Sequence, residues 1–529
     1  MFRTGLRRVT PFFRGIKNFS SSSFPATRTT TFGLLRETYN PWERRAPLTP
    51  HHVAELLEHQ PQVQVLVQPS SQRVFSDQDY RAAGAQVVED VSPADILLGV
   101  KRPLNVMDLL PNKTYLFFSH TIKGQAANMG LLQYCLDQKI QLMDYERMME
   151  PQDASLDPTH PSKQRRLVSF GRFAGLAGAI DTLGALGRRL LYTRQLSTPL
   201  LNIPPAWMHA SLQHAQETVT QVFSEQCDHG PVRLTSSESN APLVIAVTGL
   251  GGSVHSGAME ILKLLPHSLV SVQELPHVIE RAERIQDHHV ASSPVLLCPV
   301  SIADVFERID GQPFDRHDFS DHPEQYRSLF AHRVAPYCHA IVHCAYWDDR
   351  YPRLLTKAQL KRLFEQQQQQ TSIHPRLLLI SDLSCDVHGS MECLEHTTTM
   401  ERPFFQYDPI LQRVTADCIN EDLHSVTVMG VDILPAELPR ESSEFFGHQV
   451  KQVLRELALI RTHQQSERGV DVELMSPHLV SSWVLSELWS ISRLAALKDL
   501  SPYVRSDRPV QSLRQGTVSL QTTTAIWRL

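Results

Sequence analysis

Ionisable side chains follow three successive apolar runs in the first third of the chain. The runs span residues 96–100, 115–118 and 140–143. Lys101, His120 and the pair Tyr145-Glu146 stand just past their ends. If the runs are parallel strands, these groups share one edge of a sheet, where ligands of open α/β sheets gather. An imidazole titrates near neutral pH and burial lowers the pKa of an amine, so this edge suits proton transfer. Taken singly, each residue is equally consistent with an ordinary side chain.

A glycine-rich turn is the second chemical signal. It lies between an apolar run at 243–247 and a helical segment expected at 258–265. Its glycines are Gly249, Gly251, Gly252 and Gly257. Such a turn lets phosphate oxygens approach backbone N–H groups at the positive end of a helix dipole, which predicts a dinucleotide site. The spacing departs from G-x-G-x-x-G because Val254 stands where the third glycine would fall, so the turn alone could also be a plain loop.

Capping residues and short apolar runs predict the elements that carry these groups. Thr49-Pro50 is expected to open a helix ending near residue 58, and Ser76 with Asp79 is expected to cap a short second helix. Strands that alternate with helices indicate a mainly parallel sheet with helices on its faces. The expected strands of this first unit span residues 31–35, 63–67, 86–88, 96–100, 115–118 and 140–143, with a helix at 126–137.

A second unit is expected after a linker at 236–242. Its expected strands span residues 243–247, 269–272, 340–343 and 376–380. Five consecutive glutamines at 366–370 are expected to form an exposed loop. Residues 441–463 carry the apolar stripe of an amphipathic helix, which we expect to pack against the rest of the protein.

The first segment has the composition of a targeting sequence. Residues 1–36 contain six Arg, one Lys and no acid, and they include four consecutive serines. This composition is typical of a mitochondrial transit peptide, which we place at residues 1–30 with cleavage between 20 and 30. A basic tail without a targeting role is the alternative. The expected location is the mitochondrial matrix.

Charge and cysteine content exclude several classes of protein. Removing the seven cations of the leader from the 51 Lys and Arg leaves 44 against 56 Asp and Glu, which disfavours nucleic acid as a partner. Eight cysteines occur without a C-x-x-C pair, so neither a disulfide framework nor a metal site is expected. Residues 239–259 form a long stretch without Asp, Glu, Lys or Arg, but Pro242 and four glycines interrupt it, so it does not predict a membrane span.

An ordered series of motifs resembles lysine–ketoglutarate reductase, the saccharopine-forming amino-terminal part of alpha-aminoadipic semialdehyde synthase. The resemblance covers roughly residues 32–450. Alanine dehydrogenase and the transhydrogenase domain are similar at a greater distance. The motifs are WERRAPLTP (42–50), GVKRP (99–103), FFSHTIK (117–123), DYE (144–146), FGRFAGLAG (170–178), VAPY (334–337), YW (346–347), PRLLT (352–356) and LPRE (438–441).

The resemblance implies an NADPH-dependent reductive condensation of L-lysine with 2-oxoglutarate to saccharopine, the first step of lysine degradation by that route. It assigns Lys101 and His120 to an acid–base pair. The expected substrate-binding residues are Arg45 and Lys123, which match cations for substrate carboxylates, and Glu146, which matches an acid near the amino group. The expected cofactor-binding residues are Asp386, beside the nicotinamide, and Gly249, Gly251, Gly252 and Gly257 at the pyrophosphate.

The expected architecture is an α/β protein of two Rossmann-like domains with parallel sheets, a discontinuous substrate domain and an active site in the interdomain cleft. The segments are the transit peptide (1–30), the substrate domain (31–165), the dinucleotide-binding domain (166–395), a return to the substrate domain (396–463) and a C-terminal extension of unknown role (464–529).

The sequence departs from the family pattern at several points. Val387-His388 are larger than the family residues after the aspartate. Ser271 and Gln273 stand where an acid would favour an unphosphorylated ribose, which favours NADPH. The bifunctional enzymes continue into a saccharopine dehydrogenase domain, whereas this chain ends at Leu529. We therefore expect either a reductase alone, with a separate saccharopine dehydrogenase as a candidate partner, or an incomplete gene product. An alanine dehydrogenase-like enzyme and a catalytically silent ligand-binding homologue remain alternatives, and the oligomeric state is left open.

Overall fold

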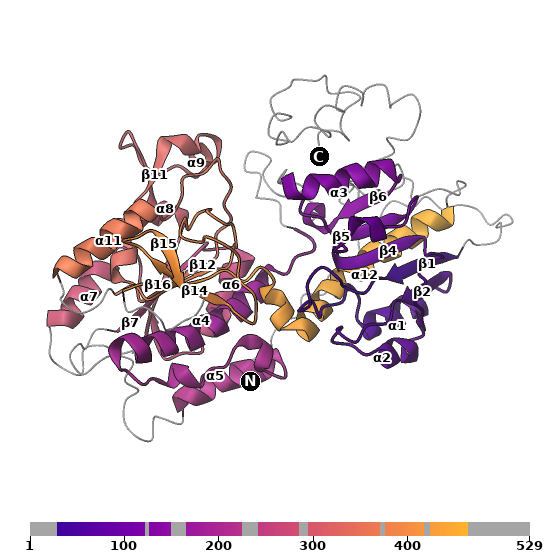
Figure 1. Cartoon of the computed structure of the whole chain (residues 1–529), viewed down its shortest axis with the longest axis horizontal. Coiled ribbons are helices and arrows are strands. Elements are labelled where there is room, and N and C mark those ends of the chain that lie inside the picture. The colour runs from indigo at the N-terminus through magenta and orange to yellow at the C-terminus, as the bar shows by residue number, and fades with distance from the viewer. Residues whose placement is uncertain are drawn as a thin grey trace, which may run out of the picture.

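Two α/β units, each built around its own sheet, make up the computed structural model (Figure 1). The structure describes residues 29–121, 126–149, 166–224, 242–284, 295–370, 376–416 and 424–463. Lys123 and the expected C-terminal extension lie outside the described residues, as does the expected transit peptide except for its last two residues.

The first unit is a six-stranded, wholly parallel sheet in the order β3-β2-β1-β4-β5-β6. Successive residues of a strand point to opposite faces of this sheet, and both faces are buried: Leu98 lies in one core and Leu97 in the other. Burial on both faces explains why the strands are continuous apolar runs. The strands are β1 (Thr30–Leu34), β2 (Val63–Val67), β3 (Gln86–Val87), β4 (Ile96–Lys101), β5 (Thr114–Phe118) and β6 (Gln141–Asp144), and the helices are α1 (Pro50–His59), α2 (Asp77–Ala82) and α3 (Ala126–Asp137). The strands expected from the sequence are confirmed here to within about one residue.

Both expected helix caps are present in this unit. The Thr49 side chain accepts from the backbone N–H of His52 at the start of α1. Ser76 and Asp79 form a reciprocal capping box at the start of α2, because each side chain accepts from the backbone N–H of the other residue.

The second unit is an eight-stranded sheet in the order β15-β14-β16-β13-β12-β7-β9-β8. Its strands are β7 (Leu243–Thr248), β8 (His267–Leu269), β9 (Val295–Val300), β12 (Ala340–His343), β13 (Leu379–Asp382), β14 (Phe404–Asp408), β15 (Arg413–Ala416) and β16 (Val426–Met429). All neighbours pair in parallel except that β14 is antiparallel to both β15 and β16. Alternate residues of β7 enter two separate cores: Ile245 lies in one and Val244 in the other.

Helices and short turns complete this unit. They are α5 (Leu212–Ser224), α6 (Ser253–Leu262), α7 (Leu275–Arg284), α8 (Ile302–Val305), α9 (Arg316–Asp321), α10 (Phe330–Arg333) and α11 (Lys357–Gln370), with the hairpin β10 (Phe306–Arg308) and β11 (Tyr326–Ser328) and the 3-10 helices η3 (Pro199–Asn202), η4 (Ala206–Met208), η6 (Pro323–Gln325), η7 (Ala335–Tyr337) and η8 (Leu434–Glu437). In the first unit the 3-10 helices are η1 (Val106–Asp108) and η2 (Tyr145–Arg147).

Two long helices connect the units (Figure 1). α4 (Gly171–Arg194) leads into the second unit, and α12 (Pro439–His463) leads back. Phe446, Val450 and Leu454 of α12 are buried in one core with Phe32 of β1, so the first unit is discontinuous in sequence, as expected.

The structure corrects five details of the sequence interpretation. The return to the first unit does not begin at residue 396, because β14–β16 hydrogen-bond beside β13 and extend the second sheet. The glutamine run lies in α11 and is not a loop. The strand expected at 269–272 is β8, which ends at Leu269, and the strand expected at 376–380 is β13, which begins at Leu379. The helix after the glycine turn begins at Ser253.

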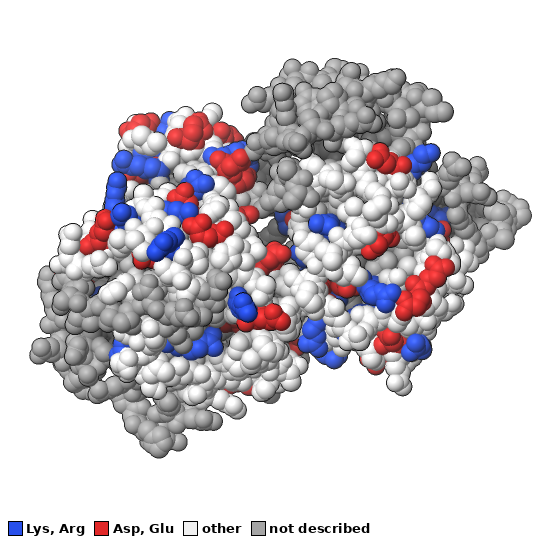
Figure 2. Space-filling view, viewed as in Figure 1, with Lys and Arg blue, Asp and Glu red and all other residues white. Residues whose placement is uncertain are grey.

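The surface shows no concentration of one charge sign on the visible face, where Lys and Arg are interspersed with Asp and Glu (Figure 2). A furrow separates the two units in the same view (Figure 2). Among the helices in the described part of the chain, none combines the length and the apolar character that a membrane span requires.

Candidate active site

Lys101, His120 and Glu146 form a line at the carboxyl edge of the first sheet. Lys101 ends β4, His120 follows β5, and Glu146 lies in η2 after β6. The Nζ atom of Lys101 is 3.2 Å from Nε2 of His120, and Nδ1 of His120 is 3.4 Å from Oε1 of Glu146. When the Lys101 ammonium donates to Nε2, Nδ1 carries the imidazole proton and points it at Glu146. The structure thus brings together the three groups that the strand ends predicted.

Local structure holds His120 in an uncommon backbone conformation. Its φ is 54°, in the left-handed region that residues other than glycine rarely adopt. The Asn128 side chain donates to the His120 carbonyl at 3.0 Å, and the imidazole stacks on the Phe118 ring. The His120 side chain remains 41% exposed, so a ligand can reach it. Strain of this kind persists only where the surroundings enforce it, and it concentrates at functional sites.

Glu37 fixes the main chain of Lys101. Its carboxylate accepts from the backbone N–H of Val100 at 2.6 Å and of Lys101 at 3.0 Å. Burial, and then the charge of Glu43, raise the pKa of Glu37 to about 8. We had no sequence signal for Glu37, because only the strand order places the end of β1 beside the end of β4.

Tyr39 and Arg166 are further neighbours that sequence reasoning missed. The Lys101 ammonium lies 6.0 Å from the centre of the Tyr39 ring. A guanidinium nitrogen of Arg166 lies 3.7 Å from Oε1 of Glu146. Arg166 precedes the FGRFAGLAG motif, and no expected element contained it. Oε1 of Glu146 therefore lies within 4 Å of both the imidazole and a guanidinium, and the Lys101 ammonium contacts the other imidazole nitrogen.

Arg45 is buried and already paired. Its guanidinium makes two bonds to the Glu43 carboxylate, at 2.7 and 2.5 Å, and lies 4.2 Å from the centre of the Phe170 ring. The loop that carries it is anchored to α12, because Ser443 Oγ accepts from the backbone N–H of Ala46. A substrate carboxylate would have to compete with Glu43 for this guanidinium.

The glycine turn between β7 and α6 has the shape that a dinucleotide requires. Gly249 and Gly251 have φ values of 76° and 89°, which only glycine adopts readily. Gly252 is the N-cap of α6, and no side chain caps that helix. A Cβ added to Gly251 would meet nothing within 4 Å, so open space lies beside the turn. These features fit phosphate oxygens at the helix N-terminus.

Gly257 corrects our expectation of four glycines under the pyrophosphate. It lies inside α6, where an added Cβ would sit 2.0 Å from the carbonyl oxygen of Arg172 in α4. A Cβ on Gly175 of α4 would likewise sit 2.0 Å from the Val254 carbonyl. These glycines let two helix backbones touch, so they fix the turn against the helix that joins the units.

The carboxyl edge of the second sheet carries buried polar groups near Asp386. Burial raises the pKa of Asp382 to about 7 and lowers the pKa of His343 to about 4. His343 pairs with the Thr248 hydroxyl at 2.9 Å. Burial raises the pKa of the Cys385 thiol, and the positive charge of Lys101 opposes that rise. The Lys101 site and the Asp386 loop therefore lie within electrostatic range of each other.

An acid does stand near the end of β8. The Glu274 carboxylate accepts from the Ser271 hydroxyl at 2.6 Å and from the Ser271 backbone N–H at 3.1 Å. The Gln273 side chain donates to Asp304. The sequence argument for NADPH, which rested on Ser271 and Gln273, therefore overlooked a carboxylate one residue further on.

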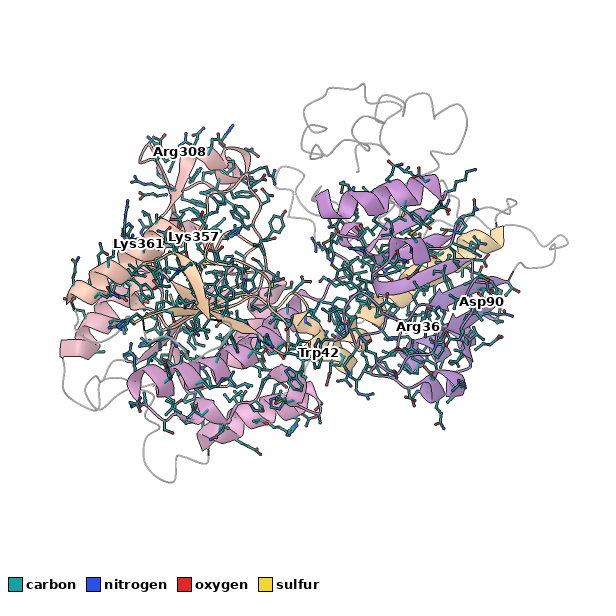
Figure 3. The ribbon with its side chains drawn as sticks, in the orientation of Figure 1. Arg36, Trp42, Asp90, Arg308, Lys357 and Lys361 are labelled. Atoms are coloured by element: carbon teal, nitrogen blue, oxygen red, sulfur yellow. The ribbon has the colours of Figure 1, made fainter. Side chains whose placement is uncertain are left out.

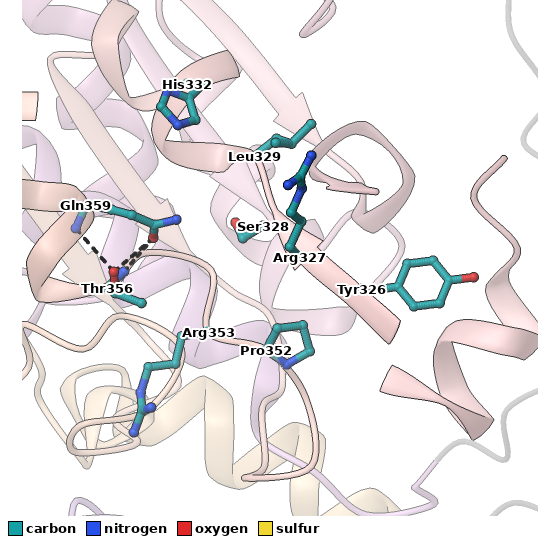
Figure 4. Close-up of a pocket in the computed structure, with 9 residues that line it drawn as sticks. All are labelled: Tyr326, Arg327, Ser328, Leu329, His332, Pro352, Arg353, Thr356 and Gln359. Carbon is teal, nitrogen blue, oxygen red and sulfur yellow. Dashed lines mark hydrogen bonds between the residues drawn. The ribbon is translucent and has the colours of Figure 1, made fainter. Parts of the chain in front are cut away.

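A pocket of about 500 Å³ lies between β11 and the start of α11 (Figure 4). Lys101, His120 and Glu146 are not among its lining residues. Both of its guanidinium groups are engaged. Arg327 pairs with Glu307 at 2.6 Å, and Arg353 donates to the His388 carbonyl at 3.0 Å. Arg353 thus ties the connection before α11 to the loop that follows Asp386.

Comparisons with known proteins agree with this organisation. Residues 33–162 match the family "Alanine dehydrogenase/PNT, N-terminal domain". A solved L-alanine dehydrogenase superposes with a TM-score of 0.50 at 16% identity, covering 89% of this chain and all of that one. The fold is therefore that of the alanine dehydrogenase class.

Sequence relatives narrow the class. The chain is 36% identical to alpha-aminoadipic semialdehyde synthase of Arabidopsis thaliana over 424 residues, which are 78% of this chain and 37% of that protein. It is 34% identical to the mitochondrial synthase of Bos taurus over 450 residues, 82% of this chain and 44% of that protein. A saccharopine dehydrogenase [NAD(+), L-lysine-forming] of Candida albicans is 24% identical over 443 residues, 80% of this chain and 91% of that protein.

The expected resemblance to alpha-aminoadipic semialdehyde synthase is confirmed by these similarities. The chain spans less than half the length of the two synthases that it matches.

Proposed function

We propose that this chain condenses L-lysine with 2-oxoglutarate and reduces the product to saccharopine with NADPH. The observation that carries the proposal is the Lys101–His120–Glu146 line, which lies at the carboxyl edge of one sheet while the other sheet bears a dinucleotide-type glycine turn. Similarity to alpha-aminoadipic semialdehyde synthase and to a saccharopine dehydrogenase supports it.

The reaction needs two proton-transfer groups in contact. The lysine ε-amine loses a proton before it attacks the keto carbon, and the oxygen of the adduct gains protons to leave as water. A nicotinamide cofactor held at the glycine turn would supply the hydride that reduces the imine. His120 takes and returns these protons, since an imidazole titrates near neutrality. Lys101, 3.2 Å from Nε2, exchanges the proton with it.

Substrate charges are met by the residues around this pair. Arg45 and Lys123 hold carboxylates of the substrates, with Arg45 leaving Glu43 to do so, and Arg166 adds a cation beside Glu146. Glu146 receives the positive amino group. Closure of the furrow between the units brings these groups to the reduced ring.

The cofactor lies along the second sheet. Gly249, Gly251 and Gly252 would hold its pyrophosphate, and Asp386 would lie on the nicotinamide side. The relatives support a nicotinamide dinucleotide in general, and we propose the phosphorylated form. The Glu274 carboxylate accepts a hydrogen bond from Ser271. The preference for NADPH over NADH depends on whether this carboxylate keeps that bond or turns toward the ribose.

The decisive experiment follows the absorbance of reduced nicotinamide with purified protein while amino acid, oxo acid and cofactor are varied independently. Oxidation of NADPH that requires both L-lysine and 2-oxoglutarate is the expected result. Turnover with pyruvate and ammonia in their place would identify an alanine dehydrogenase. Cofactor binding without turnover of any pair would identify a silent ligand-binding homologue.

We further propose import into the mitochondrial matrix, because the bovine relative is named mitochondrial and the leader is rich in Arg and Ser. A fluorescent protein fused after residue 36 should then enter mitochondria, and replacing the six leader arginines by glutamine should leave it outside them.

A further inference from the structure

The buried carboxyl group of Asp144 connects the end of β5, which precedes His120, to the main chain of Glu146. Asp144 is the last residue of β6, and its side chain is 0% exposed. Its Oδ2 atom accepts a short hydrogen bond from the Ser119 hydroxyl, and its Oδ1 atom accepts from the backbone N–H of Glu146 at 2.9 Å. One carboxylate therefore bonds both to the residue before His120 and to the main chain of Glu146.

The hydroxyl that Asp144 binds is itself held in place. Ser119 Oγ lies 2.7 Å from Thr121 Oγ1 and accepts from the Thr121 backbone N–H at 3.3 Å, and both side chains are buried. These bonds enclose His120, the residue with the left-handed backbone. The Ser119–Asp144 bond thus anchors the strained turn from which the imidazole projects.

The charges around the imidazole come from three elements. Lys101 of β4, Glu146 of η2 and Asp144 of β6 face His120, and Arg166 contacts Glu146 from the other side. Burial, and then the charge of Glu146, raise the pKa of Asp144 to about 6, while the Ser119 bond and the charge of His120 lower it. Asp144 is therefore mostly ionised at neutral pH, where its negative charge attracts a positive charge on the neighbouring imidazole.

We propose that Asp144 is a positioning residue that holds His120 and Glu146 in contact and stabilises the protonated imidazole, without touching either substrate. The consequence for turnover rests on the proposed function. The effect on the imidazole does not, because it follows from hydrogen bonds within the first unit alone.

The competing explanation is that Asp144 merely ties β5 to β6. The same strand pair offers a matched control at its opposite end, where the buried Thr114 hydroxyl donates to Gln141 at 2.8 Å. Thr114→Val removes one side-chain bond between the strands and leaves the His120 end untouched. A purely structural role predicts similar results for Asp144→Asn and Thr114→Val.

The test compares Asp144→Asn, Ser119→Ala, the double variant and Thr114→Val with the unaltered protein. The first readout is the NMR titration of histidine ¹³Cε1 signals, with the His120 signal assigned by its loss in His120→Asn. Asp144→Asn should lower the pKa of His120 by about half a pH unit or more, because a nearby negative charge is lost. Thr114→Val should leave it unchanged. The proposal would be overturned if the His120 titration midpoint were the same in the unaltered protein and in Asp144→Asn. It would also be overturned if Asp144→Asn and Thr114→Val shifted that midpoint equally.

The second readout is the pH profile of kcat/KM for L-lysine. Asp144→Asn and Ser119→Ala should each lower kcat/KM about tenfold at neutral pH. Both variants should shift the pH profile on the same side, acidic or basic, of its maximum. The double variant should be no worse than the worse single one, because both remove one bond. An additive loss, or unchanged profiles in both single variants, would contradict the proposal.

The dispersion of the NMR spectrum reports folding of each variant, and Ser119→Ala keeps the carboxylate should Asp144→Asn fail to fold. If no variant and not even the unaltered protein turns over lysine, the proposed function fails, and the NMR titration still decides the role of Asp144.

Discussion

The indole rings of Trp42 and Trp207 lie 5.9 Å apart and join the two units of the protein. Trp42 precedes Glu43 and Arg45 in the loop after β1, at the junction seen in Figure 3. Trp207 lies in η4 of the second unit, and its backbone N–H donates to Glu437 just before α12. The loop that carries the candidate carboxylate-binding arginine therefore contacts the other unit directly.

Trp42→Leu and Trp207→Leu should each destabilise the protein, and their effects should not add. Aromatic pairs contribute about 0.5–1.5 kcal/mol beyond area burial, so a double-mutant cycle in denaturant should give a coupling of that size. Trp347, whose indole donates to the Tyr351 carbonyl within the second unit, supplies the control. A cycle of Trp42→Leu with Trp347→Leu should give no coupling, and zero coupling for Trp42 with Trp207 would show that the contact has no energetic role.

Two glycine substitutions should have opposite effects on stability. Gly257→Ala should cost several kcal/mol and weaken cofactor binding, since the new Cβ would strike the α4 backbone 2.0 Å away. Gly130→Ala in α3 should stabilise by about 0.5–1 kcal/mol, because a Cβ there meets nothing within 4 Å. Chemical denaturation and cofactor titration measure both. Wild-type stability of Gly257→Ala would refute the close α4–α6 crossing.

Asp382 should make stability depend on pH. Its folded-state pKa is about 7, against 3.8 for an exposed aspartate, because burial disfavours the charge. The folded state therefore binds the proton more tightly, and this contribution to stability is lost as pH rises from about 4 to 7. Asp382→Asn should remove a slope of up to about 1.4 kcal/mol per pH unit.

The control for Asp382 has the opposite sign. Hydrogen bonds from Ser76 lower the pKa of Asp79, so its contribution is present at neutral pH and is lost on acidification. Asp382→Asn should therefore lose pH dependence between pH 4 and 8, whereas Asp79→Asn should differ from the unaltered protein in pH dependence only below about pH 4, with the opposite sign. An unchanged pH slope in Asp382→Asn would contradict a neutral buried carboxyl.

Arg45→Lys should raise the KM for 2-oxoglutarate about tenfold or more. A lysine cannot present the bidentate fork that suits a carboxylate. The dissociation constant of NADPH should not change, because the cofactor binds in the other unit. Arg44→Lys changes the exposed neighbour in the same loop and should have kinetics like the unaltered protein. Equal KM values for both variants would remove Arg45 from the site.

The first sheet was predictable from sequence because its signals are local. Apolar runs and the caps Thr49 and Ser76 act within a few residues, and the strands and helices appeared where they were expected. The glutamine run was misjudged for a related reason. Low complexity does not prevent a helix, and glutamine is a good helix former once Thr356 and Gln359 cap α11.

What the sequence could not supply was pairing over long distances. β14–β16 join the second sheet because β16 pairs with β13, and no local pattern encodes that choice. Glu37 reaches Lys101 only because β1 lies beside β4. The ion pair between Arg45 and Glu43 could have been predicted from the sequence, because opposite charges two residues apart in a loop can readily meet.

The most direct test of the central claim is the initial rate of NADPH oxidation by Lys101→Met and His120→Asn, each measured with saturating L-lysine and 2-oxoglutarate. Removing either member of a general acid–base pair should lower kcat by about 10²–10⁴-fold while the NADPH dissociation constant stays the same. Rates in both variants equal to that of the unaltered enzyme would contradict the account, because proton transfer at this strand edge would then play no part in the reaction.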